Sequence, residues 1–290
     1  MAEILRGAPA ASALTEKLRL RCSTLKETGI TPTLAIVRVG EREDDVAYEQ
    51  AAVRRCEKIG IHAKTILLPQ SCNAEVLLRT IDQINADDAV HGCLVFRPLQ
   101  DRNAESAVCA RLFAKKDVDG MTPESMAHVF SGSGDGFAPC TAEACIRLLD
   151  HYGIALSGKR VVILGRSLVV GKPLAMMMVA RNATVTFCHS KTAEIQKLAQ
   201  DADILVAALG KAVFVDRSYM HPDQIVIDVG IHEAGDGSII GDVCAEDASQ
   251  IVRAFSPVPG GVGSMTTTVL AEHVLRACED ISCISSDKSV

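Results

Sequence analysis

The apolar positions along the chain form two kinds of pattern that alternate from one end to the other. Short, nearly continuous apolar runs predict buried strands, whereas longer stretches with apolar residues three and four positions apart predict helices. In the first half, the predicted strands are 33–39, 62–68 and 92–95, and the helices between them are 45–59 and 74–85. Strands separated by helices in this way indicate βαβ units built around a parallel sheet.

The same alternation starts again after a helix predicted at 142–151. The predicted strands are 161–164, 183–187, 204–209 and 225–229, and the predicted helices are 170–181 and 195–200. This order is typical of a dinucleotide-binding domain. The predicted fold class is therefore α/β, with two βαβ domains of which the second is Rossmann-like. The last residues, 285–290, are expected to form a disordered tail.

Composition argues against several kinds of partner. With a formal net charge of -6, no tryptophan and only three tyrosines, the chain lacks the basic patch and aromatic platform typical of nucleic-acid binding. Its longest apolar runs are too short to span a bilayer. Near the N-terminus, Glu3 and Arg6 interrupt any apolar stretch long enough for a secretory signal. The expected location is cytoplasmic, with no membrane partner.

The eleven cysteines include no C-x-x-C pair. Zinc sites use closely spaced cysteine and histidine ligands, so no metal site is expected. In a chain of this length without a secretory signal, these cysteines are expected to be buried, reduced thiols.

A candidate cofactor loop lies between Val161 and Pro173, where the sequence predicts a strand, a glycine turn and the start of a helix. Gly165 follows the strand, Gly171 opens the helix, and Ser167 stands where a G-x-G-x-x-G motif would have its middle glycine. Such a turn can hold a phosphate through backbone N–H groups and the positive end of the helix dipole. A tight strand–helix turn without a ligand is the alternative.

The end of the next predicted strand favours NADP over NAD. NAD sites usually place an acidic residue about 20 positions after the glycine turn, where it binds the ribose hydroxyls. The corresponding segment, 186–192, contains no carboxylate that would repel a 2′-phosphate. Arg166 and Ser190 are candidate donors to that phosphate, because a guanidinium pairs well with it.

Several short motifs resemble those of the methylenetetrahydrofolate dehydrogenase/cyclohydrolase family, often called FolD. They occur in family order and extend over nearly the whole chain. The motifs are 116–120 (KDVDG), 139–141 (PCT), 165–167 (GRS), 170–173 (VGKP), 188–192 (CHSKT), 228–231 (DVGI), 241–243 (GDV), 257–263 (PVPGGVG) and 265–266 (MT). Each motif alone is weak, but their joint occurrence in order is specific.

The resemblance implies a folate-binding catalytic domain of residues 1–141 plus 265–290 and a Rossmann-like NADP-binding domain of residues 142–264. It places the substrate in the cleft between the two domains, and it implies a homodimer. A final helix, at about 265–279, would return to the first domain.

The resemblance also implies roles for individual residues. Tyr48 matches the family tyrosine that stacks on the pterin-side rings of the folate, and Asp119 matches the aspartate that accepts hydrogen bonds from pterin N–H groups; both are the candidate catalytic residues. The remaining substrate-binding candidates are Thr141, Pro259, Gly260 and Gly261. The cofactor-binding candidates are Gly165, Arg166, Ser167, Gly171, Ser190 and Ile231.

The departures from the family pattern cluster in its hydrolytic apparatus. The family lysine four residues after the tyrosine, which opens the methenyl ring with water, is replaced by Ala52. The family strand VQLPLP reads VFRPLQ at 95–100, so Phe96 replaces the glutamine that supports the lysine, and Arg97 and Gln100 also differ. A family serine is replaced by Asp45.

We therefore predict an NADP-dependent dehydrogenase of 5,10-methylenetetrahydrofolate whose cyclohydrolase activity is lost or impaired. Hydride transfer mainly requires that two rings be aligned, whereas hydrolysis requires proton transfers that alanine cannot relay. A separate cyclohydrolase would then hydrolyse the product. The alternatives are a bifunctional enzyme with a relocated base, for which Asp45 is a candidate, and a non-catalytic folate- or NADP-binding protein.

Overall fold

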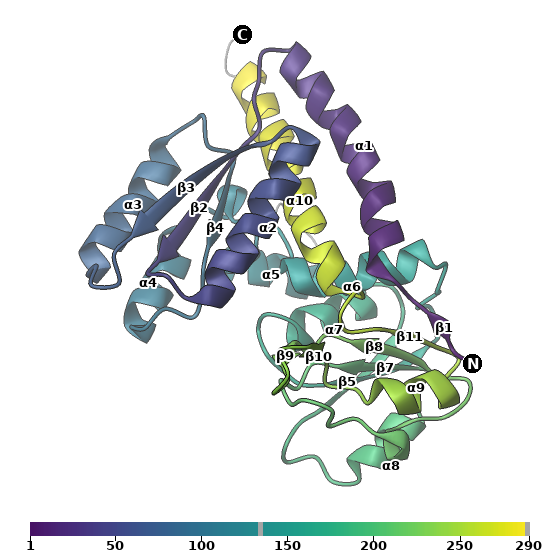
Figure 1. Ribbon diagram of the computed structural model, residues 1–290. Helices are drawn as coiled ribbons and strands as arrows, with labels where there is room; N and C mark the ends of the chain where they lie inside the picture. Colours follow the sequence, from purple (N-terminus) through teal and green to yellow (C-terminus); the bar gives the residue numbers. More distant parts are fainter. Residues whose placement is uncertain (133–135, 288–290) are drawn as a thin grey trace. The chain divides into compact units, whose positions relative to one another are not determined.

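The computed structural model describes residues 1–132 and 136–287, with side chains described up to residue 282. The chain forms two compact α/β units (Figure 1). Unit 1 consists of Met1–Ser12 and Thr141–Thr266, and unit 2 consists of Ala13–Cys140 and the chain from Thr267 onward. The long helices α1 (Gly7–Glu27) and α10 (Gly263–Asp287) each begin in unit 1 and continue in unit 2.

Unit 2 is built on a three-stranded parallel sheet with the order β3-β2-β4. Its strands are β2 (Thr33–Val39), β3 (His62–Leu68) and β4 (Gly92–Val95). The central strand β2 is buried because it has a neighbour on each side and helices pack on the sheet; Leu34 and Ile36 are fully inaccessible. The crossover helices are α2 (Glu43–Ile59) and α3 (Ala74–Ala86), and the remaining elements are α4 (Arg102–Arg111), the short 3-10 helix η1 (Ala114–Lys116) and α5 (Pro123–Ser131).

Unit 1 is built on a six-stranded parallel sheet with the order β1-β11-β8-β7-β5-β6. Its strands are β1 (Glu3–Ile4), β5 (Arg160–Leu164), β6 (Thr184–Cys188), β7 (Ile204–Ala207), β8 (Ile225–Asp228) and β11 (Ala254–Ser256). From β5 the chain goes first to β6 on one side and then to β7 on the other. This reversal of strand order makes the carboxyl end of β5 the usual ligand position of a doubly wound sheet.

The other elements of unit 1 surround this sheet. The helices are α6 (Cys140–His151), α7 (Gly171–Val179), α8 (Ile195–Gln200), η2 (Arg217–Tyr219) and α9 (Ala245–Ile251). The strands β9 (His232–Glu233) and β10 (Ile239–Ile240) form an antiparallel pair. The first residue of α6, Cys140, still belongs to unit 2. Valines, leucines and an alanine from β5, β7 and β8 pack with residues of α8, η2 and α9 in one core cluster.

The two-domain α/β architecture agrees with the sequence prediction, the predicted bounds of β2, β3 and β4 are confirmed, and residues 195–200 lie in a helix as expected. Other elements have no counterpart in the sequence prediction: β1, α1, α4, η1, α5, η2, β9, β10, α9 and β11. The predicted tail at 285–290 was wrong in part, because α10 continues to Asp287; residues 288–290 lie outside the described residues.

The N-terminus differs from the predicted domain division. Residues 1–12 were expected to fold with the folate-binding domain, but Glu3 and Ile4 pair in parallel with Ala254 and Phe255 at the edge of the unit 1 sheet. The physical reason is that a two-residue strand has no periodicity for a sequence pattern to detect, and its partner strand lies far along the chain.

No helix in the described part of the chain combines the length and apolarity that a membrane span requires. Ten cysteines are described as free thiols, and seven of them are buried. The prediction of burial is confirmed for these seven.

Candidate active site

The glycine turn of unit 1 requires glycine at both predicted positions. Gly165 has φ 120°, and a Cβ there would lie 2.1 Å from the carbonyl oxygen of Ala208. A Cβ at Gly171, where α7 begins, would lie 2.5 Å from the carbonyl oxygen of Gly165. No side chain fits at either position, so the backbone of the turn stays close to the end of β5. This tight strand–turn–helix is the geometry that a phosphate-binding loop needs.

Ser167 shapes this loop through its hydroxyl. Its Oγ accepts a hydrogen bond from the N–H of Val170 at 3.1 Å and lies 3.5 Å from the nitrogen of Gly171. The hydroxyl therefore satisfies backbone donors at the start of α7, where helices have no internal partners. Ser167 and Arg166 are both exposed, in keeping with a loop that faces a ligand.

The loop after β6 carries the remaining predicted residue for the 2′-phosphate. The N–H of His189 donates to the Thr192 hydroxyl at 2.9 Å, and the N–H of Lys191 donates to the His189 ring at 3.1 Å. These bonds fold residues 189–192 into a compact turn, with Ser190 exposed on it.

A pocket of about 260 Å³ in unit 1 brings together four residues that the sequence had singled out. Ile231, Pro259, Gly260 and Gly261 all line it, although Ile231 was predicted to contact the cofactor and the others the substrate. Thr141 is half-buried in the first turn of α6, and its carbonyl oxygen accepts a hydrogen bond from the Cys145 thiol at 3.4 Å.

Two buried aspartates hold the loops near this pocket. The carboxylate of Asp228 accepts hydrogen bonds from the N–H groups of Gly230, Asp242 and Val243 at 2.9–3.0 Å. Burial raises the pKa of Asp228 to about 6, although these three hydrogen bonds act in the opposite direction. The sequence analysis quoted the motifs DVGI and GDV but assigned no role to their carboxylates.

Asp242 is the second of these aspartates and is fully inaccessible. Its carboxylate accepts hydrogen bonds from three consecutive N–H groups, those of residues 209–211, and lies 2.7 Å from Nε2 of His232. Leu209 and its neighbours follow β7, so Asp242 ties the end of a central strand to the β9–β10 hairpin. The sequence signal for this role is that a glycine lies within two residues of each aspartate, Gly230 after Asp228 and Gly241 before Asp242.

The N-terminal segment supports the glycine-rich loop at 257–263. The N–H of Gly7 donates to the carbonyl of Gly260 at 2.8 Å, and a Cβ at Gly7 would lie 2.1 Å from the carbonyl oxygen of Gly261. The Tyr152 hydroxyl donates to the carbonyl of Arg6 at 3.0 Å. Sequence reasoning missed these contacts because their partners are at least 146 residues apart in the sequence.

Unit 2 contains a larger pocket, of about 440 Å³, at the carboxyl ends of its three strands. Its lining includes Arg42, Asp45, Phe96 and Gln100. Asp45 is buried; burial raises the pKa of its carboxyl, and Arg42, with Nε 3.7 Å from a carboxylate oxygen, partly opposes this. Three of the positions that depart from the family pattern, 45, 96 and 100, thus lie around one pocket.

Tyr48 and Phe96 are in contact beside this pocket. Their ring centroids are 5.8 Å apart and the planes meet at 82°, an edge-to-face arrangement that aromatic pairs prefer. Ala52, one turn further along α2, is 0% exposed. Position 52 therefore presents no polar group, and position 96 presents an aromatic ring to Tyr48.

The KDVDG segment gives its charged residues different environments. The Lys116 ammonium group is buried and donates to the carbonyls of Ile84, Asn85 and Asp87 at 2.7–3.2 Å, at the C-terminal end of α3. The Asp117 carboxylate is fully buried and accepts the N–H groups of residues 121 and 122. Of the two carboxylates in the motif, Asp119 is the more accessible, with 24% of its side chain exposed.

Asp119 faces a guanidinium group. A carboxylate oxygen of Asp119 lies 3.9 Å from a terminal nitrogen of Arg97, which follows β4. Burial raises the pKa of Asp119, while Arg97 and hydrogen bonds from Cys140 act in the opposite direction. The sequence analysis identified both Asp119 and the unusual Arg97, but it did not connect them.

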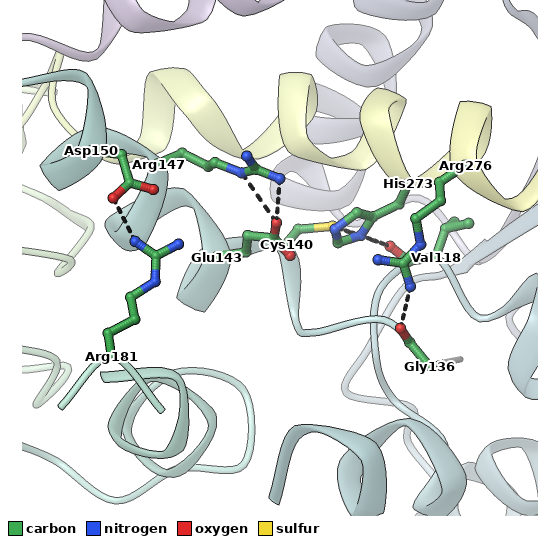
Figure 2. A network of polar contacts seen from close by, with 9 residues as sticks. All are labelled: Val118, Gly136, Cys140, Glu143, Arg147, Asp150, Arg181, His273 and Arg276. Atoms are coloured by element: carbon green, nitrogen blue, oxygen red, sulfur yellow. Dashed lines mark hydrogen bonds and ion pairs between the residues drawn. The ribbon is translucent and has the colours of Figure 1, made fainter. Parts of the chain in front are cut away.

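A buried network involves Val118, the residue before Asp119 (Figure 2). Nδ1 of His273 lies 2.8 Å from the carbonyl oxygen of Val118 and 3.8 Å from the sulfur of Cys140. Because a carbonyl oxygen can only accept, Nδ1 must carry the ring proton. The sulfur of Cys140 also lies 3.3 Å from the Val118 carbonyl. These contacts hold the carbonyl of Val118, next to Asp119, against α10.

Comparisons with known proteins agree with this geometry. Residues 5–119 match the model of the tetrahydrofolate dehydrogenase/cyclohydrolase catalytic domain, and residues 139–282 match that of the NAD(P)-binding domain of the same family. Bifunctional protein FolD 1 of Desulfitobacterium hafniense (strain Y51) is 46% identical over 279 residues, which cover 96% of this chain and 99% of that protein. The chain belongs to the tetrahydrofolate dehydrogenase/cyclohydrolase family.

Solved structures of the tetrahydrofolate dehydrogenase/cyclohydrolase family share the fold along the whole chain. The bifunctional FolD enzyme of Campylobacter jejuni superposes with a TM-score of 0.93 and is 34% identical, with 97% of this chain and 99% of that chain covered. A 5,10-methylenetetrahydrofolate dehydrogenase from the silkworm, Bombyx mori, has a TM-score of 0.89 and 32% identity, with 97% of this chain and 99% of that chain covered. The two-domain α/β fold and the family predicted from the sequence are both confirmed.

Proposed function

We propose that this protein oxidises 5,10-methylenetetrahydrofolate to 5,10-methenyltetrahydrofolate by hydride transfer to NADP. The observation that carries the proposal is the glycine turn at 165–171, which excludes side chains at both glycines within the NAD(P)-binding domain of a folate enzyme family. A FolD enzyme of Trypanosoma brucei, 29% identical with a TM-score of 0.91, has been solved with NADP and an inhibitor, which supports this choice of cofactor.

The cofactor would be held by the turn and by the loop after β6. The turn formed by Gly165, Ser167 and Gly171 would let the pyrophosphate approach the backbone at the start of α7. Arg166 and Ser190, both exposed, would bind the 2′-phosphate, and no carboxylate in 186–192 would repel it. Ile231 would pack against the nicotinamide. When bound, NADP supplies the hydride acceptor, the C4 carbon of its nicotinamide ring.

The folate would be held by Tyr48 and Asp119 in unit 2. The Tyr48 ring would stack on the pterin-side rings, while the edge of Phe96 limits where the Tyr48 ring can lie. The Asp119 carboxylate would accept hydrogen bonds from pterin N–H groups. Thr141, Pro259, Gly260 and Gly261 would contact the junction of folate and nicotinamide. As hydride leaves the methylene carbon, the lone pair of the adjacent folate nitrogen stabilises the methenyl cation, so no general base is needed.

Cyclohydrolysis would be lost or impaired in this chain. Opening the methenyl ring requires water addition and proton transfer, for which general acid–base help is worth roughly 10²–10⁴ in rate. Ala52 is buried and apolar, and Phe96 packs against Tyr48 instead of offering an amide. A separate cyclohydrolase would then be required to hydrolyse the product.

The test is to mix the protein with methylenetetrahydrofolate and NADP and to follow NADPH and methenyltetrahydrofolate absorbance together. We expect both to rise, with the methenyl signal decaying at the enzyme-free rate, and we expect a higher kcat/KM with NADP than with NAD. Equal kcat/KM for NAD would contradict the cofactor choice. Absence of both signals would favour a non-catalytic binding protein.

A bifunctional enzyme with a relocated base is the second candidate. Two observations favour it: relatives such as that of D. hafniense are named bifunctional, and the Asp45 carboxyl has a raised pKa within the pocket that Phe96 lines. If the methenyl signal decays faster as enzyme is added, the Asp45→Asn variant should abolish the acceleration while NADPH formation continues. An unchanged rate in that variant would exclude Asp45 as the base.

A further inference from the structure

Arg97 and Asp119 form a contact that the family sequence pattern does not predict. The guanidinium nitrogen and the carboxylate oxygen are 3.9 Å apart, and both side chains are largely buried, with 20% and 24% exposed. At this burial the attraction is weakly screened by solvent, unlike that of exposed ion pairs. The two charges therefore influence each other much more than a surface pair would.

Arg97 is also held from its other side. The Cys109 thiol of α4 hydrogen-bonds the guanidinium group, and Glu105 contributes negative charge nearby. Glu105 itself is fixed, since its carboxylate accepts the N–H of Leu99 at 2.8 Å. Arginine has a planar group with five donors, so it can contact Cys109 and Asp119 together. The side chain is thus constrained to face Asp119.

The charges around Asp119 come from three segments. Arg97 faces it from the end of β4, Cys140 hydrogen-bonds it from the start of α6, and Asp117 is the nearby carboxylate on its own segment. Among these groups Arg97 alone is a cation. The ionised form of Asp119 therefore depends on Arg97.

We propose that Arg97 is a positioning residue of the folate site, which holds Asp119 as an ionised, oriented acceptor for the pterin and supplies the cation that Ala52 lacks. The inference rests on the proposed folate-binding role of Asp119. Arginine stays protonated at all physiological pH values, so it strengthens folate binding but cannot exchange protons with water. The Arg97 guanidinium would therefore support folate binding without promoting hydrolysis of the methenyl ring.

The direction of the pH effect follows from this arrangement. An ionised Asp119 accepts hydrogen bonds, and protonation as the pH falls removes that capacity. The guanidinium lowers the pKa of Asp119 against the effect of burial. Removing it raises this pKa, so folate affinity should begin to fall at a higher pH. A purely structural role for Arg97 would lower affinity equally at every pH.

The experiment measures equilibrium binding of tetrahydrofolate, under anaerobic conditions, as a function of pH. We compare the wild-type chain with Arg97→Leu, the family residue, and with Arg97→Lys, which keeps a positive charge. For Arg97→Leu we expect tetrahydrofolate affinity at neutral pH to fall at least about tenfold. We also expect the acidic limb, the part of the pH profile in which affinity falls as the pH decreases, to move to higher pH. Arg97→Lys should recover much of both effects, and NADP affinity should not change.

A matched control and the contradicting results complete the test. Arg79→Leu removes an exposed guanidinium that pairs with Glu75 on α3, and it should behave as wild type. The inference is overturned if Arg97→Leu leaves the acidic limb in place, or if Arg97→Lys is as weak as Arg97→Leu. Because binding is measured without turnover, absence of NADPH formation would refute the proposed reaction and not the role of Arg97.

Discussion

At the scale of single residues, burial gives the charged groups of residues 116–119 different tasks. Lys116 binds three carbonyls at the end of α3, Asp117 binds two backbone N–H groups, and Asp119 faces Arg97. The motif alone does not distinguish these charged residues, although only Asp119 is exposed enough to contact a ligand. The distinction follows from what packs around each side chain: Lys116 and Asp117 are buried, and Asp119 is partly exposed.

Lys116 should therefore matter for stability. In Lys116→Met the side chain keeps a similar length but loses the ammonium group that the carbonyls of residues 84, 85 and 87 share. Burial lowers the pKa of Lys116, so part of the loss is offset by avoiding a buried charge. We expect the free energy of unfolding to fall by about 2–3 kcal/mol in chemical denaturation, because buried carbonyls lose a charged donor.

The neighbouring lysine provides the control for this prediction. Lys115 is exposed, with its ammonium group 5.9 Å from the ring centroid of Phe113. Lys115→Met should change the free energy of unfolding by no more than about 0.5 kcal/mol. Equal effects of the two substitutions would show that the carbonyl contacts of Lys116 contribute nothing specific.

At the scale of elements, the junction of β5 and α7 depends on close backbone approach. Gly165 and Gly171 are separated by five residues, yet a Cβ at Gly171 would meet the Gly165 carbonyl. The loop can close only because both positions lack side chains. The helix N-terminus and the strand end are thereby kept close enough for one phosphate group to reach both.

The substitution Gly171→Ala should disturb cofactor binding selectively. The new methyl group would be 2.5 Å from a backbone oxygen, so the turn must shift, and small displacements of a binding loop are costly. We expect NADP affinity, measured by titration calorimetry, to fall about tenfold or more, with tetrahydrofolate affinity unchanged. Gly235→Ala in the same unit is the control, since its Cβ would have no neighbour within 4 Å. Full NADP affinity in Gly171→Ala would argue against the proposed phosphate site.

At the scale of the whole molecule, each unit has its own parallel sheet, and the chain passes from one unit to the other inside α1, between Cys140 and Thr141, and inside α10. The N-terminal strand β1 belongs to the unit 1 sheet, whereas the chain from Thr267 onward belongs to unit 2, so each unit combines two separate segments of the sequence. Neither unit corresponds to a single continuous stretch of chain.

The homodimer that the family resemblance implies stays a prediction. Light scattering of the purified protein should give a mass about twice the 30.9 kDa of one chain. We expect this ratio to persist on dilution, because family dimers are expected to be stable without ligand. A mass equal to that of one chain over the whole concentration range would contradict the expectation.

The sequence by itself determined the parts of the molecule that depend on local patterns. The strands β2, β3 and β4 have the predicted bounds because alternating apolar runs and turns are readable within a few residues. The glycine turn was predictable for the same reason, since a strand end, two glycines and a helix start lie next to each other. The family motifs added the proposed substrate-binding roles of Tyr48 and Asp119.

Only the tertiary structure decided the pairings between distant residues. The contacts of β1 with β11, of Arg97 with Asp119, and of Asp242 with the end of β7 join positions that no local pattern connects. Burial also decided which charges are structural and which face a ligand, because burial depends on everything packed around a side chain. The sequence named the chemical groups of the site, and the fold determined which of them act together.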